Sequence, residues 1–287
     1  MTQGGVKTRI KTALTAFPDR YALPSRPATA QPTVQDAFRQ TQFLLSSDLD
    51  LFEKMMNLQI QIVKANSRLR TPEAASLFSF WSRAFSHMAD ACTMMTLGSY
   101  SATPPLLRAA CDCVAAQRSL LADGFGEYES WLENAVSQDR EHAAMAFDLG
   151  RFRAGSALAE DERLGGLFRL LGDLSMPHFG ATAFQVAPDS NLQKISIAFG
   201  DCAFHLGWAE LIGGWLLLLC DVQLTAVVSS GVFVVDHATL AVYQSYSREV
   251  ASSLGNGRRC YVEEVDGRFL FHNFRRTASG SPKRVLL

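Results

Sequence analysis

The sequence lacks the short motifs that identify the common nucleotide-binding and hydrolase classes. It has no glycine-rich phosphate loop, no Gly-x-Gly-x-x-Gly dinucleotide pattern and no Gly-x-Ser-x-Gly nucleophile turn. It also lacks the Glu-x-x-His pairs with which helical bundles hold two iron ions. These absences exclude the enzyme classes that depend on those motifs, and no cofactor can be named from the sequence.

Cysteine occurs at six positions but never as a Cys-x-x-Cys pair. Cys111 and Cys113 are two residues apart, so they point in different directions on a helix. Most of the six lie among alanine, leucine and methionine, where a free cysteine behaves as a small apolar side chain. This usage favours a reducing compartment, and therefore the cytoplasm, over a disulfide framework. The N-terminal residues also lack the apolar core of a secretory signal.

No dense run of lysine and arginine occurs, and the formal net charge is -1. The charge is uneven, because residues 1–26 and residues 258–287 each carry +4 whereas the residues between them carry -9. Basic ends of this kind are most often solvated tails, and contact with nucleic acid or an anionic surface is the sharper alternative. A protein partner or a second copy of the chain is the other class of partner we consider.

The 287 residues are 48% hydrophobic, which is enough to build a sizeable core. Apolar residues recur at helical spacing along most of the chain, and this pattern predicts an all-α bundle of about seven helices with a short C-terminal β-hairpin. The prediction divides the chain into an irregular basic lead-in over residues 1–34, a helical bundle over residues 35–255, and a hairpin with a basic tail over residues 256–287.

Capping residues and turn signals place the individual elements. Thr71-Pro72 and Thr103-Pro104 each predict a helix start, and Asp266-Gly267 predicts the turn of the hairpin. Ser46–Asp48 predicts either a break in the first helical stretch or its solvent-facing side. The remaining expectations are helices over 34–68, 126–149, 157–175 and 236–253 and a loop over 176–192.

The most apolar stretch, Ile195–Val235, is the expected centre of the fold. We expect a long buried helix over Leu192–Val228, with a kink near Gly213. The alternative is a single membrane span over residues 211–235, which are long enough to cross a bilayer. A span would place Asp221 in the middle of the membrane, and no basic cluster flanks it to set an orientation. The pattern therefore favours a soluble core, and a membrane is not an expected partner.

This stretch contains four ionisable residues, which need partners if they are buried. They are Asp201, His205, Glu210 and Asp221. The best candidate partner is Arg108, which lies on an apolar helix, and Arg118 is a second candidate. An Arg–carboxylate bridge would lock helices together, whereas the functional interpretation is a polar pocket inside the bundle.

Asp201 and His205 are four residues apart, which on a helix places both side chains on one face. A carboxylate and an imidazole on one face are a potential metal-binding pair, so both residues are candidate metal ligands. The more ordinary interpretation is a buried pair whose hydrogen bonds are satisfied within the core.

Two short patches, Pro104–Asp112 and Leu174–His178, resemble a group of bacterial all-helical proteins, some of which are abortive-infection or phage-defence proteins. In that group a Leu-Leu-Arg helix carries an acid four residues after the arginine, and a Leu-Ser…His element follows later in the chain. The resemblance implies that Arg108, Asp112, Ser175 and His178 share a site. It makes Arg108, Asp112 and His178 the candidate catalytic residues.

Three functional hypotheses follow. The first is a non-catalytic interaction or regulatory protein, and the second is a hydrolase or nuclease that uses Arg108, Asp112 and His178. The third is a single-span membrane protein. A buried arginine–carboxylate bridge would favour the first hypothesis, and a cleft where His178 meets Arg108 and an acid would favour the second.

Overall fold

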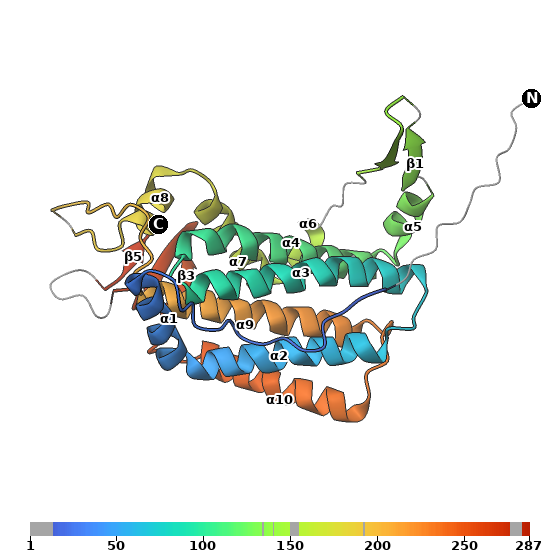
Figure 1. Ribbon diagram of the computed structural model, residues 1–287, viewed down its shortest axis with the longest axis horizontal. Coiled ribbons are helices and arrows are strands. Elements are labelled where there is room, and N and C mark those ends of the chain that lie inside the picture. The colour runs from blue at the N-terminus through green and yellow to red at the C-terminus, as the bar shows by residue number, and fades with distance from the viewer. Residues whose placement is uncertain (1–13, 134, 140, 150–154, 192, 276–282) are drawn as a thin grey trace, which may run out of the picture.

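The computed structural model describes residues 14–133, 135–139, 141–149, 155–191, 193–275 and 283–287. Within them the chain forms ten α-helices, one short 3-10 helix and five short strands (Figure 1). The helices are α1 (Pro32–Leu44), α2 (Ser46–Ala65), α3 (Pro72–Thr96), η1 (Tyr100–Ala102), α4 (Thr103–Ala122), α5 (Gly126–Leu132), α6 (Gly155–Glu160), α7 (Glu162–Ser175), α8 (Phe179–Val186), α9 (Leu206–Ser229) and α10 (His237–Leu254). The strands are β1 (Val136–Asp139), β2 (Ala144–Phe147), β3 (Tyr261–Val265), β4 (Arg268–His272) and β5 (Val285–Leu286). The predicted helical bundle with a C-terminal hairpin is confirmed in outline, although the expected number of helices was too low.

Helix α9 forms the centre of the bundle, and α2, α3, α4 and α10 pack around it along the long axis of the molecule (Figure 1). Its side chains are buried along almost the whole length, because a helix that is apolar on every side can only be stable when it is surrounded. It is long and apolar enough to cross a membrane, but most of it is buried inside the protein. This burial is consistent with the core helix of a soluble protein.

The predicted extent of the central helix, Leu192–Val228, was wrong at its N-terminal end. The helix begins only at Leu206, because the His205 side chain accepts a hydrogen bond from the backbone N–H of Trp208 and caps the first turn. Residues 193–205 form no helix or strand. No break occurs at Gly213, which lies within the continuous helix.

Two other element predictions also failed. The helix expected over 126–149 ends at Leu132, and an antiparallel hairpin of β1 and β2 follows, with Ala143 at a positive φ of 48°. The expected loop 176–192 contains helix α8. In residues 136–149 the large apolar side chains are exposed, so packing against the core does not enforce a helix there. In α8 the opposite holds, because Ala181 and Phe184 are buried against the core and stabilise a short helix.

The first helical stretch breaks at Leu45, one residue before the Ser46–Asp48 signal. Thr71 caps α3 as expected, since its hydroxyl accepts from the N–H of Ala74 at 3.2 Å. Thr103 does not cap α4 but lies inside its first turn. Its hydroxyl donates to the carbonyl oxygen of Tyr100, so η1 leads directly into the helix.

The C-terminal strands form a three-stranded antiparallel sheet in the order β3-β4-β5. The predicted turn between β3 and β4 is confirmed, and Asp266 and Gly267 both have positive φ there, at 52° and 73°. The sheet packs against α8 and the start of α9 through aromatic side chains. These are Phe184, Trp208, Phe271 and Phe274.

Residues 14–31 contain no helix or strand and follow the surface of the bundle (Figure 1), and α1 begins at Pro32, inside the lead-in predicted over residues 1–34. The backbone N–H of Tyr21 donates to the Asn57 side chain at 2.9 Å, and Lys64 donates to the carbonyl oxygen of Asp19 at 2.6 Å. These bonds attach the described part of the lead-in to α2.

Candidate functional site

Arg259 is the one arginine that the structure buries within the described part of the chain. It lies between α10 and β3, and its side chain is 9% exposed. Its guanidinium group contacts Asp48 of α2 and Glu210 in the first half of α9. A buried charge of this kind needs several partners to offset the loss of water.

The guanidinium group of Arg259 makes three polar contacts within the described residues. Nη1 lies 2.6 Å from Oδ2 of Asp48 and donates to the Ser253 hydroxyl at 2.9 Å, while Nη2 donates to the main-chain oxygen of Glu210 at 2.6 Å. The Ser253 hydroxyl in turn donates to the other oxygen of Asp48 at 2.9 Å. The arginine therefore joins α2, α9 and α10, which are distant in the sequence.

Gly213 and Gly214 provide the space for this guanidinium group. A Cβ atom at Gly214 would lie 3.3 Å from Nη2 of Arg259 and 3.2 Å from a methyl carbon of Leu254. A Cβ atom at Gly213 would lie 3.2 Å from a methyl carbon of Leu45 and 3.5 Å from Nη2. The glycine pair that suggested a kink therefore allows the arginine to lie against the helix backbone.

The backbone around Arg259 is held on both sides. The N–H of Cys260 donates to the Glu210 carboxylate at 2.9 Å, and the Asn273 amide donates to the carbonyl oxygens of Gly257 and Arg259. The N–H of Arg259 itself donates to the carbonyl oxygen of Asn256 at 3.0 Å. The arginine is thus fixed by its own loop as well as by its ion pair.

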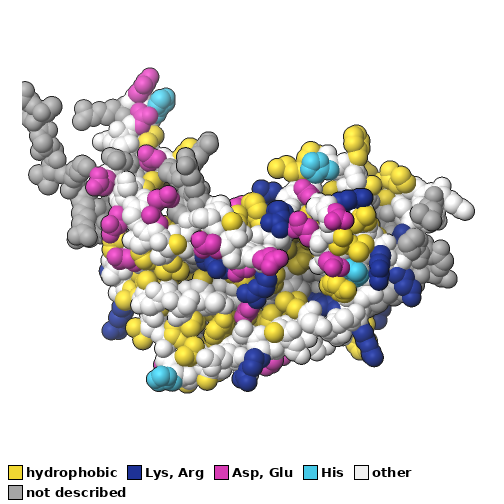
Figure 2. Space-filling model, turned by 180° about the vertical axis from the view of Figure 1, so that it is seen from behind, with side chains coloured by type: hydrophobic (Ala, Val, Ile, Leu, Met, Phe, Trp, Pro, Cys, Tyr) yellow, Lys and Arg dark blue, Asp and Glu magenta, His cyan; other side chains and the backbone are white. Residues whose placement is uncertain are grey.

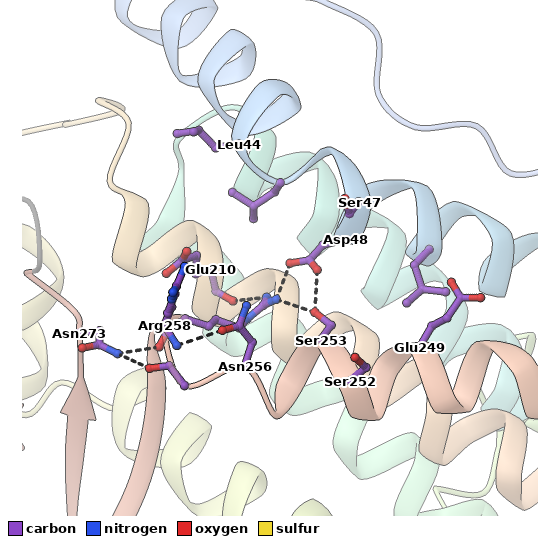
Figure 3. A pocket seen from close by; sticks show the side chains of 14 residues that line it. Leu44, Ser47, Asp48, Glu210, Glu249, Ser252, Ser253, Asn256, Arg258 and Asn273 are labelled. Carbon is purple, nitrogen blue, oxygen red and sulfur yellow. Dashed lines mark hydrogen bonds and ion pairs between the residues drawn. The ribbon is translucent and has the colours of Figure 1, made fainter.

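The Arg259 cleft, as we name the cavity over this group, has a volume of about 950 Å³. Its walls combine polar side chains with leucines, and they come from α2, α9, α10, the loop before β3 and the end of β4 (Figure 3). The lining residues are Leu44, Leu45, Ser47, Asp48, Leu51, Glu210, Glu249, Ser252, Ser253, Asn256, Gly257, Arg258, Arg259 and Asn273.

The polar side chains of the cleft are those of aspartate, glutamate, serine, asparagine and arginine. The carboxylate of Asp48 is engaged by Arg259 and Ser253, so both of its oxygens already accept hydrogen bonds. The exposed polar side chains of the cleft include an acidic residue, Glu249, and a basic residue, Arg258, together with hydrogen-bonding serine and asparagine side chains.

A second cavity of about 290 Å³ lies on the other side of Glu210 and Arg259, which line both spaces. Its walls are mainly apolar and come from α7, α9 and the C-terminal sheet. Arg163 lies at this cavity, 3.7 Å from the carboxylate of Asp221.

The predicted partnership of Arg108 with the charges of the central stretch was wrong. The Arg108 guanidinium carbon lies 4.5 Å from the centre of the Phe168 ring on α7, and no ion pair of Arg108 is recorded among the described residues. Arg118, the other candidate, pairs with Asp161. The Glu210 carboxylate instead accepts from the N–H of Cys260, and Arg259 binds the main-chain oxygen of Glu210. The cation near Asp221 is Arg163.

The four residues that the resemblance assigned to one site do not all contact one another in the described part of the structure. His178 is exposed at the start of α8, and the Ser175 hydroxyl donates to Leu171 of its own helix. Asp112 is exposed, and partial burial raises the pKa of its carboxyl group against the lowering effect of Arg108. No contact joins His178 to Arg108 or Asp112 in the described residues, so the catalytic set Arg108, Asp112 and His178 stays a prediction.

Asp201 and His205 do not share a helix face, because both precede the start of α9. The Asp201 carboxylate accepts from the N–H of Ala203, and His205 lies 4.8 Å from the ring of Phe274. No group of three or more His, Cys, Asp or Glu side chains that could hold a metal ion occurs in the described residues. The proposed metal pair therefore has no third ligand of these types there.

Sequence reasoning missed Arg259 and Asp48 because no local signal joins them. The available signals were Gly213-Gly214 inside an apolar helix, and the Arg258-Arg259 pair that follows the Asn256-Gly257 turn. Comparisons with protein-family models, curated proteins and solved structures found no match.

Proposed function

We propose that this chain is a non-catalytic interaction protein that binds a polar segment of a partner protein in the Arg259 cleft. The observation that carries the proposal is the convergence of fixed polar groups around the buried Arg259–Asp48 pair, at the wall of a cleft of about 950 Å³. That volume falls in the range of about 300–1,000 Å³ typical of ligand sites. A cleft whose polar groups are already oriented loses little entropy when a ligand binds.

The charges on the walls support a peptide-like ligand. Glu249 and Arg258 are exposed and opposite in sign, and serine and asparagine side chains lie between them. A ligand with only negative charge would be repelled by Asp48, Glu210 and Glu249. A polypeptide segment offers both donors and acceptors, as well as apolar groups that suit the leucines of the wall.

The cytoplasmic location and the defence association belong to the same proposal. All six cysteines are free, which supports a reducing compartment. The resemblance to abortive-infection proteins would make the partner a component of a defence response. Loss of plaque reduction in a strain that carries a cleft-blocking variant would support that role, and unchanged protection would contradict it.

A peptide display experiment with two matched variants tests the proposed function. Ser252→Trp places a bulky side chain in the cleft, whereas Ala251→Trp places it on the neighbouring exposed position of α10, which does not line the cleft. A random peptide library would be selected on the full-length protein, and the enriched peptides would be titrated against both variants. We expect Ser252→Trp to weaken binding by about tenfold or more, and Ala251→Trp to leave it unchanged.

The comparison of the two variants decides the outcome. Peptides that bind Ser252→Trp as well as the natural protein would place binding elsewhere and overturn the proposal. A selection that yields no peptide with a dissociation constant below about 1 mM would overturn it as well. Urea unfolding of both variants verifies that the tryptophan has not disturbed the fold.

A further inference from the structure

Large apolar side chains are exposed at both ends of the molecule. At one end they lie on the β1–β2 hairpin and just after it. These residues are Val136, Met145, Phe147 and Leu149. At the other end they lie before and on α8 and in the segment that precedes α9. This second group, which we call the apolar tip, consists of Met176, Phe179, Ile195, Ile197 and Phe199.

The most exposed part of the apolar tip is the extended segment Ile195–Phe199. The N–H of Ser196 donates to the Ser190 hydroxyl at 3.0 Å, and the N–H of Ala198 donates to the carbonyl oxygen of Val186 at 2.8 Å. Alternate residues therefore face the protein, and the three large side chains between them face solvent, with Phe199 and Phe179 fully exposed.

Basic residues lie beside the apolar tip. We call Arg275, Lys283 and Arg284 the basic segment. Arg275 donates its backbone N–H to Lys283, and it follows Phe274, whose ring centre lies 4.5 Å from that of Phe184 on α8. Lys194 directly precedes the exposed segment. Figure 2 shows basic side chains next to hydrophobic ones at this end of the molecule.

The opposite end has the opposite charge. Residues 123–148 carry seven acidic residues and one basic residue. Three acids also lie close to these residues in the sequence, Asp173, Asp189 and Asp201, against four described cations, Lys194, Arg275, Lys283 and Arg284. The charge distribution therefore orients the apolar tip, and not the β1–β2 hairpin, toward a negatively charged surface.

We infer that the apolar tip docks on the surface of an anionic lipid bilayer. The exposed apolar side chains would enter the boundary between headgroups and acyl chains, and the surrounding lysine and arginine side chains would contact anionic headgroups. Exposed aliphatic and aromatic residues beside a basic segment match both components of such a surface. A second copy of the chain fits less well, because a symmetric contact would bring two basic segments together. This surface contact leaves α9 in the core of the protein.

Sedimentation of the full-length chain with lipid vesicles tests this inference. One set of vesicles contains phosphatidylcholine alone, and the other contains about one third phosphatidylserine. We expect binding to the phosphatidylserine vesicles only, and we expect it to weaken as salt screens the basic segment. Equal binding to both vesicle types, or no binding to either, would overturn the inference.

Two matched double variants separate the two apolar ends. Ile197→Ser with Phe199→Ser removes part of the apolar tip, and Met145→Ser with Phe147→Ser makes a similar change at the acidic end. We expect the first pair to lower the vesicle partition coefficient by at least about tenfold, because two large side chains no longer enter the bilayer. The second pair should leave it unchanged, and equal losses in both pairs would contradict the inference.

Sedimentation equilibrium without lipid tests the competing occupant. A natural protein that forms a dimer, and that Ile197→Ser with Phe199→Ser converts to a monomer, would assign the apolar tip to self-association and overturn the inference. A monomer in both cases supports the lipid surface when the vesicle results agree. Neither result depends on the Arg259 cleft, so the peptide experiment stands independently.

Discussion

The two halves of helix α9 each face an arginine, but in very different ways. In the first half, Glu210 and the glycines beside it lie against Arg259, which makes three polar contacts and is 9% exposed. In the second half, Asp221 is buried and its nearest recorded cation is Arg163, at 3.7 Å and 58% exposed. The other carboxylate oxygen of Asp221 is buried without a hydrogen-bond partner among the described residues.

The difference shows when a buried charge stabilises a fold. A charge removed from water is compensated only by short, well-directed hydrogen bonds and by a partner that is itself shielded. Arg259 meets these conditions, whereas Asp221 has one long contact with a solvated side chain, which contributes little. The buried ion pair of the first half of α9 therefore stabilises its contacts with neighbouring helices. In the second half the charged contact contributes little, and the polar contacts there are the neutral ones of Gln223 with Gln117 and of Thr225 with Tyr243.

Arg259→Met should remove the polar contacts that stabilise the first half of α9. The substitution leaves the Asp48 carboxylate, 14% exposed, and the carbonyl oxygen of Glu210 without their cation. We expect the free energy of unfolding to fall by about 3–5 kcal/mol, measured by urea denaturation. Arg163→Met is the matched control and should change it by less than about 1 kcal/mol. Equal effects of the two substitutions would remove the distinction between the halves.

Lowering the pH should destabilise the start of α9 through His205. Burial lowers the pKa of this imidazole to about 4, and the charge of Arg275 adds to the effect while Asp189 and Asp201 oppose it. The folded pKa lies below the unfolded value of 6.5, so the stabilisation is present above pH 6.5 and is lost as the pH falls toward 4. We expect a loss of up to about 3 kcal/mol over this window, measured by urea unfolding at several pH values.

His205→Asn isolates the contribution of this histidine. Asparagine can accept the capping hydrogen bond from Trp208 but does not titrate in this range. The variant should therefore lose most of the pH dependence between 6.5 and 4. A variant that keeps the dependence would assign it to other groups, and it would show that proton uptake at this cap does not weaken the helix start.

Gly214→Val should disturb Arg259 without removing it. The new side chain would approach Arg259 and Leu254, both of which lie within 3.4 Å of the position of its Cβ atom. We expect a loss of about 1–3 kcal/mol in unfolding free energy, because the guanidinium group or Leu254 must move. Gly166→Val on α7 is the control, since its Cβ position lies 3.9 Å from the nearest neighbouring atom, on Arg169. A smaller loss at Gly214 than at Gly166 would contradict the role of the glycine pair.

The elements that could be predicted are those with strong local signals. The Thr71 cap and the Asp266-Gly267 turn lie where the sequence places them, because capping and turn chemistry involve neighbouring residues only. The centre of the fold was also predictable, since a helix that is apolar on all sides must be buried. These signals determine where elements occur, but they do not determine which elements meet.

The site could not be predicted for that reason. The pair of Arg259 and Asp48 joins residues near opposite ends of the described chain, and no helical spacing relates them. Arg108 was the expected partner because it lies among apolar residues, but the long side chain packs its charge on the ring of Phe168. The same limit applies to Ile195–Gly200, where apolar composition predicted helix although the segment lies on the surface.

Asp221→Leu should have the smallest effect of these substitutions, and it should raise the free energy of unfolding rather than lower it. Leucine has the same branched shape as aspartate, so it fits the same space in the core of the bundle and removes the buried oxygen that lacks a partner. Arg163 is mostly exposed, so it stays hydrated when its distant partner is lost. We expect the free energy of unfolding to rise by about 1 kcal/mol in urea denaturation. A double-mutant cycle with Arg163→Met should give a coupling energy below about 0.5 kcal/mol. A stability loss in Asp221→Leu would show instead that the second half of α9 contains a compensated charge, and the two halves of the helix would then be alike.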